Sequence, residues 1–111
     1  MKTIAIPVFG SRISNRLDYS EKVLFVAIED GVILDQHFYN WAHANPLERI
    51  GILECNGVEL LICDGITEFY ANQFENSPIR VIPWISGDVN EVLRRYLAGT
   101  LIQHKLAGAR E

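Results

Sequence analysis

The chain has 111 residues, of which 49% are hydrophobic and 22% charged, as in a folded globular protein. This length supports one hydrophobic core, so we expect a single domain over residues 1–111. A formal net charge of −4 excludes a broad nucleic-acid-binding face, which needs clustered Lys and Arg. No apolar run approaches the roughly 20 residues that span a bilayer, and two cysteines form no disulfide framework. The sequence therefore predicts a cytoplasmic protein without a membrane or nucleic-acid partner.

The first half of the chain predicts three strands. Residues 3–8 form a continuous apolar run, typical of a strand that is covered on both faces. A polar loop follows at 9–20, and a loop of this length between short elements is often functional. Asp30-Gly31 then predicts a hairpin between strands at 22–29 and 32–40, because both turn positions favour a positive φ.

Three helices and two further strands are predicted in the second half. The helices are expected at 46–56, 67–75 and 88–98, separated by short apolar strands at 59–63 and 79–84. The expected N-caps are Asn45, Thr67 and Asp88. Glu48 and Glu91 stand three residues after their caps and predict two capping boxes. The tail beyond Ile102 is expected to fray.

A hairpin followed by βα units indicates an α/β fold with a mixed sheet. Right-handed crossovers place the fourth strand beside the first. The expected sheet has five strands in the order 3-2-1-4-5, with strand 2 antiparallel and three main helices, an RNase H-like arrangement. The chain then leaves strands one and four in opposite directions, which creates a crevice outside their carboxyl ends.

An anionic ligand fits that crevice. Gly65 allows close approach of the backbone, the helix beginning at Thr67 offers N–H groups, and Arg12 and Arg16 add positive charge. The candidate binding residues are Gly10, Ser11, Arg12, Asp64, Gly65, Ile66 and Thr67. The alternative is an ordinary βα turn, since glycine and an N-cap threonine occur in many such turns. No glycine-rich phosphate-binding motif is present.

Three residues are candidate metal ligands. Cys63 ends its strand at the crevice and is either a thiolate ligand for iron–sulfur species or a small buried side chain. His37 and His43 flank the end of the third strand and are either a ligand pair or two exposed loop histidines. Cys55 is expected in the core and His104 in an inert tail. The chain has no C-x-x-C, which argues against structural zinc.

Catalysis is disfavoured. Nucleases with this kind of sheet hold two metal ions with carboxylates, one of them on the first strand, but KTIAIPVFG has no acidic residue. The serines of the first loop lack a nucleophile-elbow pattern. We expect a protein that is not an enzyme.

Three segments together resemble the dinitrogenase iron-molybdenum cofactor biosynthesis family, of the NifX/NafY type that also occurs at the end of NifB proteins. They are the opening MKTIAIPVFGSRIS, the hairpin VLFVAIEDGVILDQ and the stretch from VELLICDGITEF to VLRRYLAGTL. The resemblance covers nearly residues 1–101.

The resemblance implies an RNase H-like domain that carries or senses an iron–sulfur or iron-molybdenum-type cluster, with other cluster-assembly proteins as partners. The chain departs from the family pattern in two places. It has no histidine or cysteine in the first loop, and Asp64-Gly65 replaces the usual Gly-Gly pair. The alternative function is therefore a protein-interaction or regulatory module that no longer binds a cluster.

Overall fold

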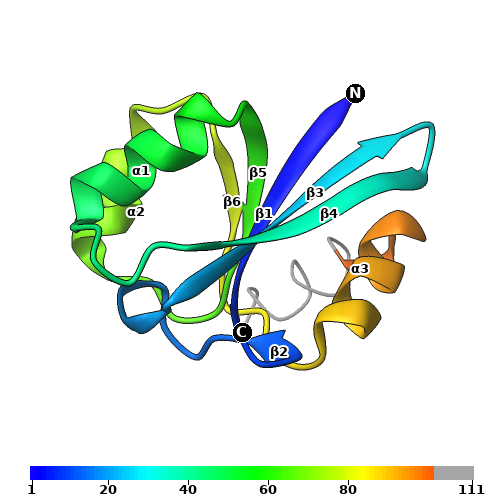
Figure 1. The fold of residues 1–111 in the computed structure, drawn as a ribbon, viewed down its shortest axis with the longest axis horizontal. Helices are drawn as coiled ribbons and strands as arrows, with labels where there is room; N and C mark the ends of the chain where they lie inside the picture. The colour runs from blue at the N-terminus through cyan, green and yellow to red at the C-terminus, as the bar shows by residue number, and fades with distance from the viewer. Residues whose placement is uncertain (102–111) are drawn as a thin grey trace.

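The computed structural model describes residues 1–101, which form one mixed sheet between helices on both faces (Figure 1). The strands are β1 (Lys2–Phe9), β2 (Arg12–Ile13), β3 (Lys22–Glu29), β4 (Val32–Asn40), β5 (Val58–Ile62) and β6 (Arg80–Ile82). The helices are α1 (Pro46–Cys55), α2 (Glu68–Glu75) and α3 (Val89–Leu97), with a 3-10 turn at Leu17–Tyr19. The tail predicted to fray lies outside the described residues.

The five principal strands follow the predicted order, β4-β3-β1-β5-β6. Strand β3 is antiparallel to β1 and β4, whereas β5 and β6 run parallel to β1. The prediction of five strands is wrong, because β2 pairs with β1 and makes a sixth. Two features of the predicted loop explain this strand: Gly10 has a φ of 63° that permits a tight reversal, and Ile13 is only 1% exposed. An apolar side chain inside a polar segment thus extends the sheet.

The three predicted N-caps are confirmed. The Asn45 side chain accepts a hydrogen bond from the Glu48 N–H at 2.8 Å, and the Glu48 carboxylate accepts one from the Asn45 N–H at 2.8 Å. Thr67 caps α2 and Asp88 caps α3. The second capping box was predicted wrongly. The carboxylate of Glu91 accepts instead from two arginines one turn along α3, Arg94 and Arg95, which offer charged donors on the same helix face.

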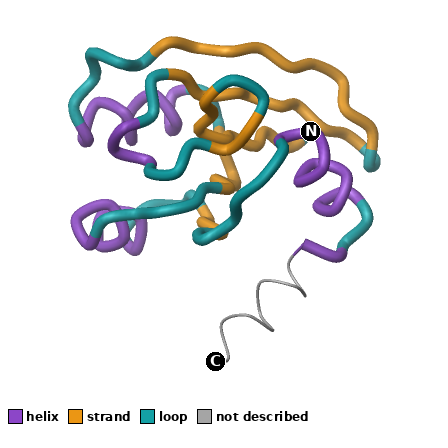
Figure 2. The backbone as a smooth tube through the Cα atoms, turned by 90° about the horizontal axis from the view of Figure 1, so that it is seen from below, coloured by secondary structure: helices purple, strands orange, loops and turns teal. Residues whose placement is uncertain are grey.

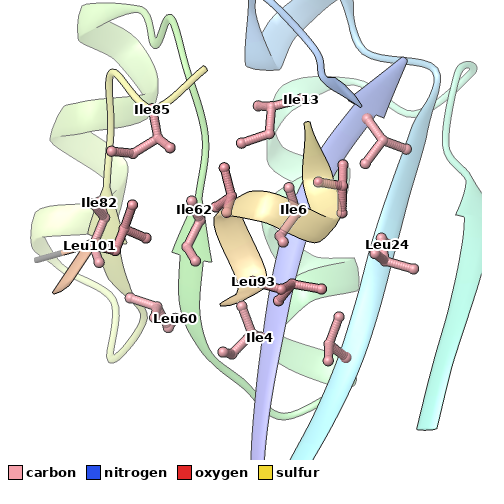
Figure 3. Packing of buried hydrophobic residues seen from close by; sticks show 14 of the residues in the cluster. Ile4, Ile6, Ile13, Leu24, Leu60, Ile62, Ile82, Ile85, Leu93 and Leu101 are labelled. Atoms are coloured by element: carbon pink, nitrogen blue, oxygen red, sulfur yellow. The ribbon is translucent and has the colours of Figure 1, made fainter. Parts of the chain in front are cut away.

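Each face of the sheet has its own apolar core, because side chains alternate along β1. Ile4, Ile6 and Val8 pack toward α3 (Figure 3), whereas Ala5 packs toward α1 and α2. The prediction that Cys55 is in the core is wrong, since its side chain is exposed. The buried positions of α1 include Leu53, and a residue two positions later lies about 200° further around the helix.

A buried arginine joins α1 to the chain that precedes β3. Arg49 is only 5% exposed, and its Nη1 donates to the Leu17 carbonyl at 3.0 Å and to Ser20 Oγ at 3.3 Å. Its Nε donates to the Ala44 carbonyl at 3.0 Å. The guanidinium also lies 5.0 Å from the ring centroid of Trp41. This one side chain therefore satisfies carbonyls from two separate connections.

Replacement of Arg49 by lysine tests this role. An ammonium cannot reproduce the planar set of donors or the stacking on Trp41, so we expect Arg49→Lys to lower the free energy of unfolding by about 2 kcal/mol. The exposed Arg80 supplies the matched control, and Arg80→Lys is expected to change it by less than about 0.5 kcal/mol. Urea unfolding measures both, and equal effects would contradict the role assigned to Arg49.

Candidate functional site

Three connections meet at the carboxyl ends of β1, β5 and β6, and we call residues 9–20, 63–67 and 83–88 together the loop end. Figure 2 views the molecule from this end. The Gly65 N–H donates to the Asn15 carbonyl at 2.8 Å, and the Leu17 N–H donates to the Gly65 carbonyl at 2.9 Å. The segment after β6 joins both, since the Trp84 N–H donates to the Asp64 carbonyl at 3.1 Å. The predicted convergence of the first and fourth principal strands is therefore present.

The crevice at the strand switch is filled by backbone. A Cβ added to Gly65 would lie 2.9 Å from the carbonyl oxygen of Asn15, so this position has no room for a side chain. The amide of Gly65 already donates to Asn15, and the Thr67 hydroxyl accepts from the Tyr70 N–H. In this arrangement Gly65 pairs the first loop with the exit of β5.

An open cavity lies beside this junction, within the first loop. It has a volume of about 340 Å³ and is lined by Phe9, Arg12, Ile13, Ser14, Asn15, Arg16 and Tyr19. Arg16 pairs with Asp18 at 3.1 Å and lies 4.8 Å from the Tyr19 ring centroid. Arg12 is exposed and takes part in none of the ion pairs found within residues 1–101. The cavity thus combines two guanidinium groups with apolar walls.

Three aromatic residues of the loop end escaped the sequence analysis. Phe9, Tyr19 and Trp84 are 74%, 72% and 60% exposed, although large aromatic side chains usually find a place in a core. Trp84 also has a φ of 66°, which is rare for a residue with a bulky side chain. Their positions directly after strands, or in the first loop, are the only signal that the sequence offers for them.

The seven predicted ligand-binding residues lie in two connections of the loop end. Gly10, Ser11 and Arg12 lie in and beside the β1–β2 turn, and the Val89 N–H donates to the Ser11 carbonyl at 2.9 Å. Residues 64–67 lie in the connection from β5 to α2. The loop end therefore holds all seven of the predicted ligand-binding residues.

The three predicted metal ligands are dispersed. Cys63 is at the loop end, but it has no solvent exposure and packs in the core beneath α1 and α2. His37 is in the middle of β4, opposite Phe25, and stacks on that ring with centroids 5.3 Å apart. His43 follows β4 in an exposed connection that is separated from β1 by β3. Within residues 1–101, no three His, Cys, Asp or Glu side chains are grouped so that they could hold a metal ion.

Burial raises the pKa of Asp64 above its ordinary value of 3.8. The unfolded chain consequently releases this proton at a lower pH than the folded protein does. Asp64 is directly beside the junction at Gly65, so its ionised carboxylate is a cost to the folded state at neutral pH.

Comparisons with known proteins agree with this architecture. The protein PH0822 shares 19% identity, covering 87% of this chain and 91% of that one, with a TM-score of 0.80. MJ0327 from Methanocaldococcus jannaschii shares 21% identity over 88% and 89% of the two chains, with a TM-score of 0.73. The apo form of the orange protein from Desulfovibrio gigas shares 15% identity over 90% of both chains, with a TM-score of 0.71. No curated protein matches the chain in sequence.

The fold and the loop end define a small α/β domain with three of its connections gathered at the carboxyl ends of the parallel strands of a mixed sheet. The family model described as dinitrogenase iron-molybdenum cofactor matches residues 1–99. The chain therefore belongs to the dinitrogenase iron-molybdenum cofactor family, as the resemblance of its segments predicted. Among residues 1–101, no helix is long and apolar enough to cross a membrane.

The junction can be tested with a pair of glycines. We expect Gly65→Ala to destabilise the protein by about 2–3 kcal/mol, since the new methyl group meets a backbone oxygen that cannot move without breaking the pairing. Gly51 is the matched control, because it lies within α1 with nothing within 4 Å of an added Cβ. Gly51→Ala is expected to stabilise by about 0.5–1 kcal/mol. Thermal or urea unfolding that ranks the two variants the other way would contradict the packing at Gly65.

Asp64→Asn tests the raised pKa. For the natural protein, the free energy of unfolding decreases as the pH rises from 3.8 toward the higher folded pKa, because only the unfolded chain has then lost the proton. The asparagine variant should be more stable than the natural protein at pH 7. The difference in the free energy of unfolding should vanish below about pH 3, where the Asp64 carboxyl is protonated in both the folded and the unfolded chain. A variant that is less stable at pH 7 would contradict the assignment.

Proposed function

We propose that this domain is a non-enzymatic carrier or sensor of a preformed, anionic metal–sulfur cluster of the iron–sulfur or iron-molybdenum type. The cluster is its cargo, and other cluster-assembly proteins in the cytoplasm are its proposed partners. Membership of the family supports this class of function. We further interpret the mixed sheet as RNase H-like, which the family resemblance predicted.

The observation that carries the proposal is the cavity of the first loop. Arg12 and Arg16 bring two guanidinium groups, of which that of Arg16 is already paired with Asp18, to a volume of about 340 Å³, and Phe9 and Tyr19 supply its apolar walls. Guanidinium groups bind diffuse anions through several N–H donors at once.

The distribution of metal-binding side chains supports the binding of a cluster that retains its own sulfide ligands. Within residues 1–101, no three metal-binding side chains are grouped together, so assembly of a cluster from free ions has little support. Charge and hydrogen bonding then replace coordination as the source of affinity. Gly10, Ser11 and residues 64–67 do not line this cavity, but they lie in the neighbouring turns of the loop end, and we propose that they contact the cargo from its edge.

Ligation by Cys63 remains a proposal with a structural condition. Its side chain is fully buried in the core beneath α1 and α2, so this packing must open before the sulfur meets a cluster. His43 lies in the connection after β4, whereas His37 is within the strand, and His43 would be the second ligand if that connection moved as well.

Cluster binding by charge variants tests the proposal. The double variant Arg12→Gln/Arg16→Gln is expected to weaken binding of a chemically prepared iron–sulfur cluster at least about tenfold, because both guanidinium groups are lost. Arg80→Gln is the control, since Arg80 is an exposed arginine at the amino end of β6, whereas the loop end is at the carboxyl ends of the strands. Anaerobic titration followed by visible absorption measures the affinity. Equal binding by all three proteins would refute the assigned site.

A second measurement separates charge from ligation. We expect Cys63→Ser to retain the affinity within about twofold, because the buried sulfur is not required for binding by charge. A folded Cys63→Ser protein that no longer binds the cluster would establish this residue as a ligand. Circular dichroism of each variant shows whether the fold is intact.

A protein-interaction or regulatory module is the second candidate function. The exposed aromatic residues Phe9, Tyr19 and Trp84 favour it, because aromatic side chains are enriched at the centres of protein interfaces. A natural protein that takes up no cluster but retains a partner from the same cells, in a manner that depends on these side chains, would support this alternative.

A further inference from the structure

The edge strand β4 has few of the features that usually prevent pairing with another chain, apart from Asp35 and a β-bulge at Leu34. It has nine residues, VILDQHFYN, with no lysine, arginine or proline. Four of its apolar side chains are strongly exposed, and they are Val32, Leu34, Phe38 and Tyr39. Strand β4 is the last in the sheet order, and the outermost strand in Figure 2 has no other strand beyond it. Natural edge strands usually carry charges, proline or short lengths that prevent such pairing.

We propose that β4 pairs antiparallel with β4 of a second copy of this chain, with Gln36 on the twofold axis. The two sheets then continue into one. The proposal concerns a surface separate from the loop end, because β3 lies between β4 and β1. It does not depend on the proposed cluster function.

Symmetry restricts the possible registers. A twofold axis perpendicular to the sheet leaves each face on its own side, so residues directly opposite each other across the new pair must come from the same face. Side chains alternate between faces along a strand. In the allowed registers, the residue nearest the axis is therefore directly opposite the same residue of the other copy.

Charge selects among the remaining registers. An axis at Gln36 places Asp35 opposite His37 of the other copy, twice in the dimer, and places Leu34 opposite Phe38. An axis at Asp35 would place two carboxylates against each other, and an axis at His37 would place two imidazoles against each other, which costs free energy when they are charged. The sequence around Gln36 is thus self-complementary in both charge and apolar character.

The observed conformation of β4 is compatible with this register. Asp35 and His37 already lie on one face, with Oδ2 and Nδ1 3.7 Å apart. Phe38 is opposite Leu24, which packs in the core beneath α3, so Phe38 belongs to the other face. The bulge in the pairing with β3 falls at Leu34, and Asp35–Asn40 pairs regularly. The regularly paired segment includes Gln36 and its neighbours Asp35 and His37.

The dimer should be a weak one. A single pair of strands buries less than the roughly 1,600 Å² of a standard interface, so we expect a dissociation constant on the order of 10–500 µM. Sedimentation equilibrium of the full chain from about 5 µM to 1 mM covers this range. A chain that stays monomeric at about 1 mM overturns the proposal.

Lysine substitutions test the edge. Phe38→Lys is expected to raise the dissociation constant at least about tenfold, because it places a charge at an edge position that meets Leu34 of the other copy. Leu47→Lys is the matched control, since Leu47 is 61% exposed on α1 and lies outside β4. Dimerisation that is lost in Leu47→Lys and retained in Phe38→Lys overturns the proposal.

A charge exchange tests the register. His37→Asp places a carboxylate opposite Asp35 and should weaken the dimer about tenfold. Addition of Asp35→Lys restores an opposite-charge pair at the same position, so the double variant should recover most of the loss. Failure of the second substitution to restore association, in a protein whose circular dichroism is unchanged, overturns the register centred on Gln36.

Discussion

The paired backbones of residues 15–17 and Gly65 hold the loop end together. Two hydrogen bonds, of 2.8 and 2.9 Å, join the first loop to the exit of β5, and the glycine leaves space for the Asn15 carbonyl where any side chain would collide. Further backbone bonds then join the segment after β6 to both connections, including the one from Trp84 N–H to the Asp64 carbonyl. The pairing with Gly65 places Arg16 beside the exit of β5 and determines which surface of the first loop faces solvent. A short backbone contact is thus the constraint on which the proposed site depends.

A closed junction changes what the domain can offer to a ligand. The Gly65 amide is paired with the Asn15 carbonyl, so the proposed binding of an anion relies mainly on side chains that surround the junction. Arg12 and Arg16 are the cationic residues there, Arg16 already paired with Asp18, and Phe9 and Tyr19 give them a partly apolar setting. Such a surface suits cargo that is complete before it arrives and must be released again. Several direct bonds from protein to metal would hold the cargo more firmly and would slow its transfer.

The buried cation of Arg49 stabilises the opposite side of the same loop. Its guanidinium donates to carbonyls near both ends of the 17–49 segment and stacks on Trp41, so α1 and the 3-10 turn are held in one position. The loop end therefore has a rigid support on the face of α1 and α2. At the edge of the sheet, no strand of the described residues lies beyond β4. The molecule combines a well-supported loop end with an exposed edge strand.

The sequence by itself determined the order of the five principal strands, the three helices and their N-caps, because these depend on local periodicity, capping chemistry and the handedness of crossovers. It also indicated correctly that the exits of β1 and β5 meet. Tertiary structure decided the rest. The pairing of β2, the exposure of Cys55, the burial of Cys63 and the separation of His37 from the loop end all depend on which residues oppose each other across the sheet. Whether an amide is available to a ligand depends on its partner, and the partner of Gly65 is fifty residues away in the chain.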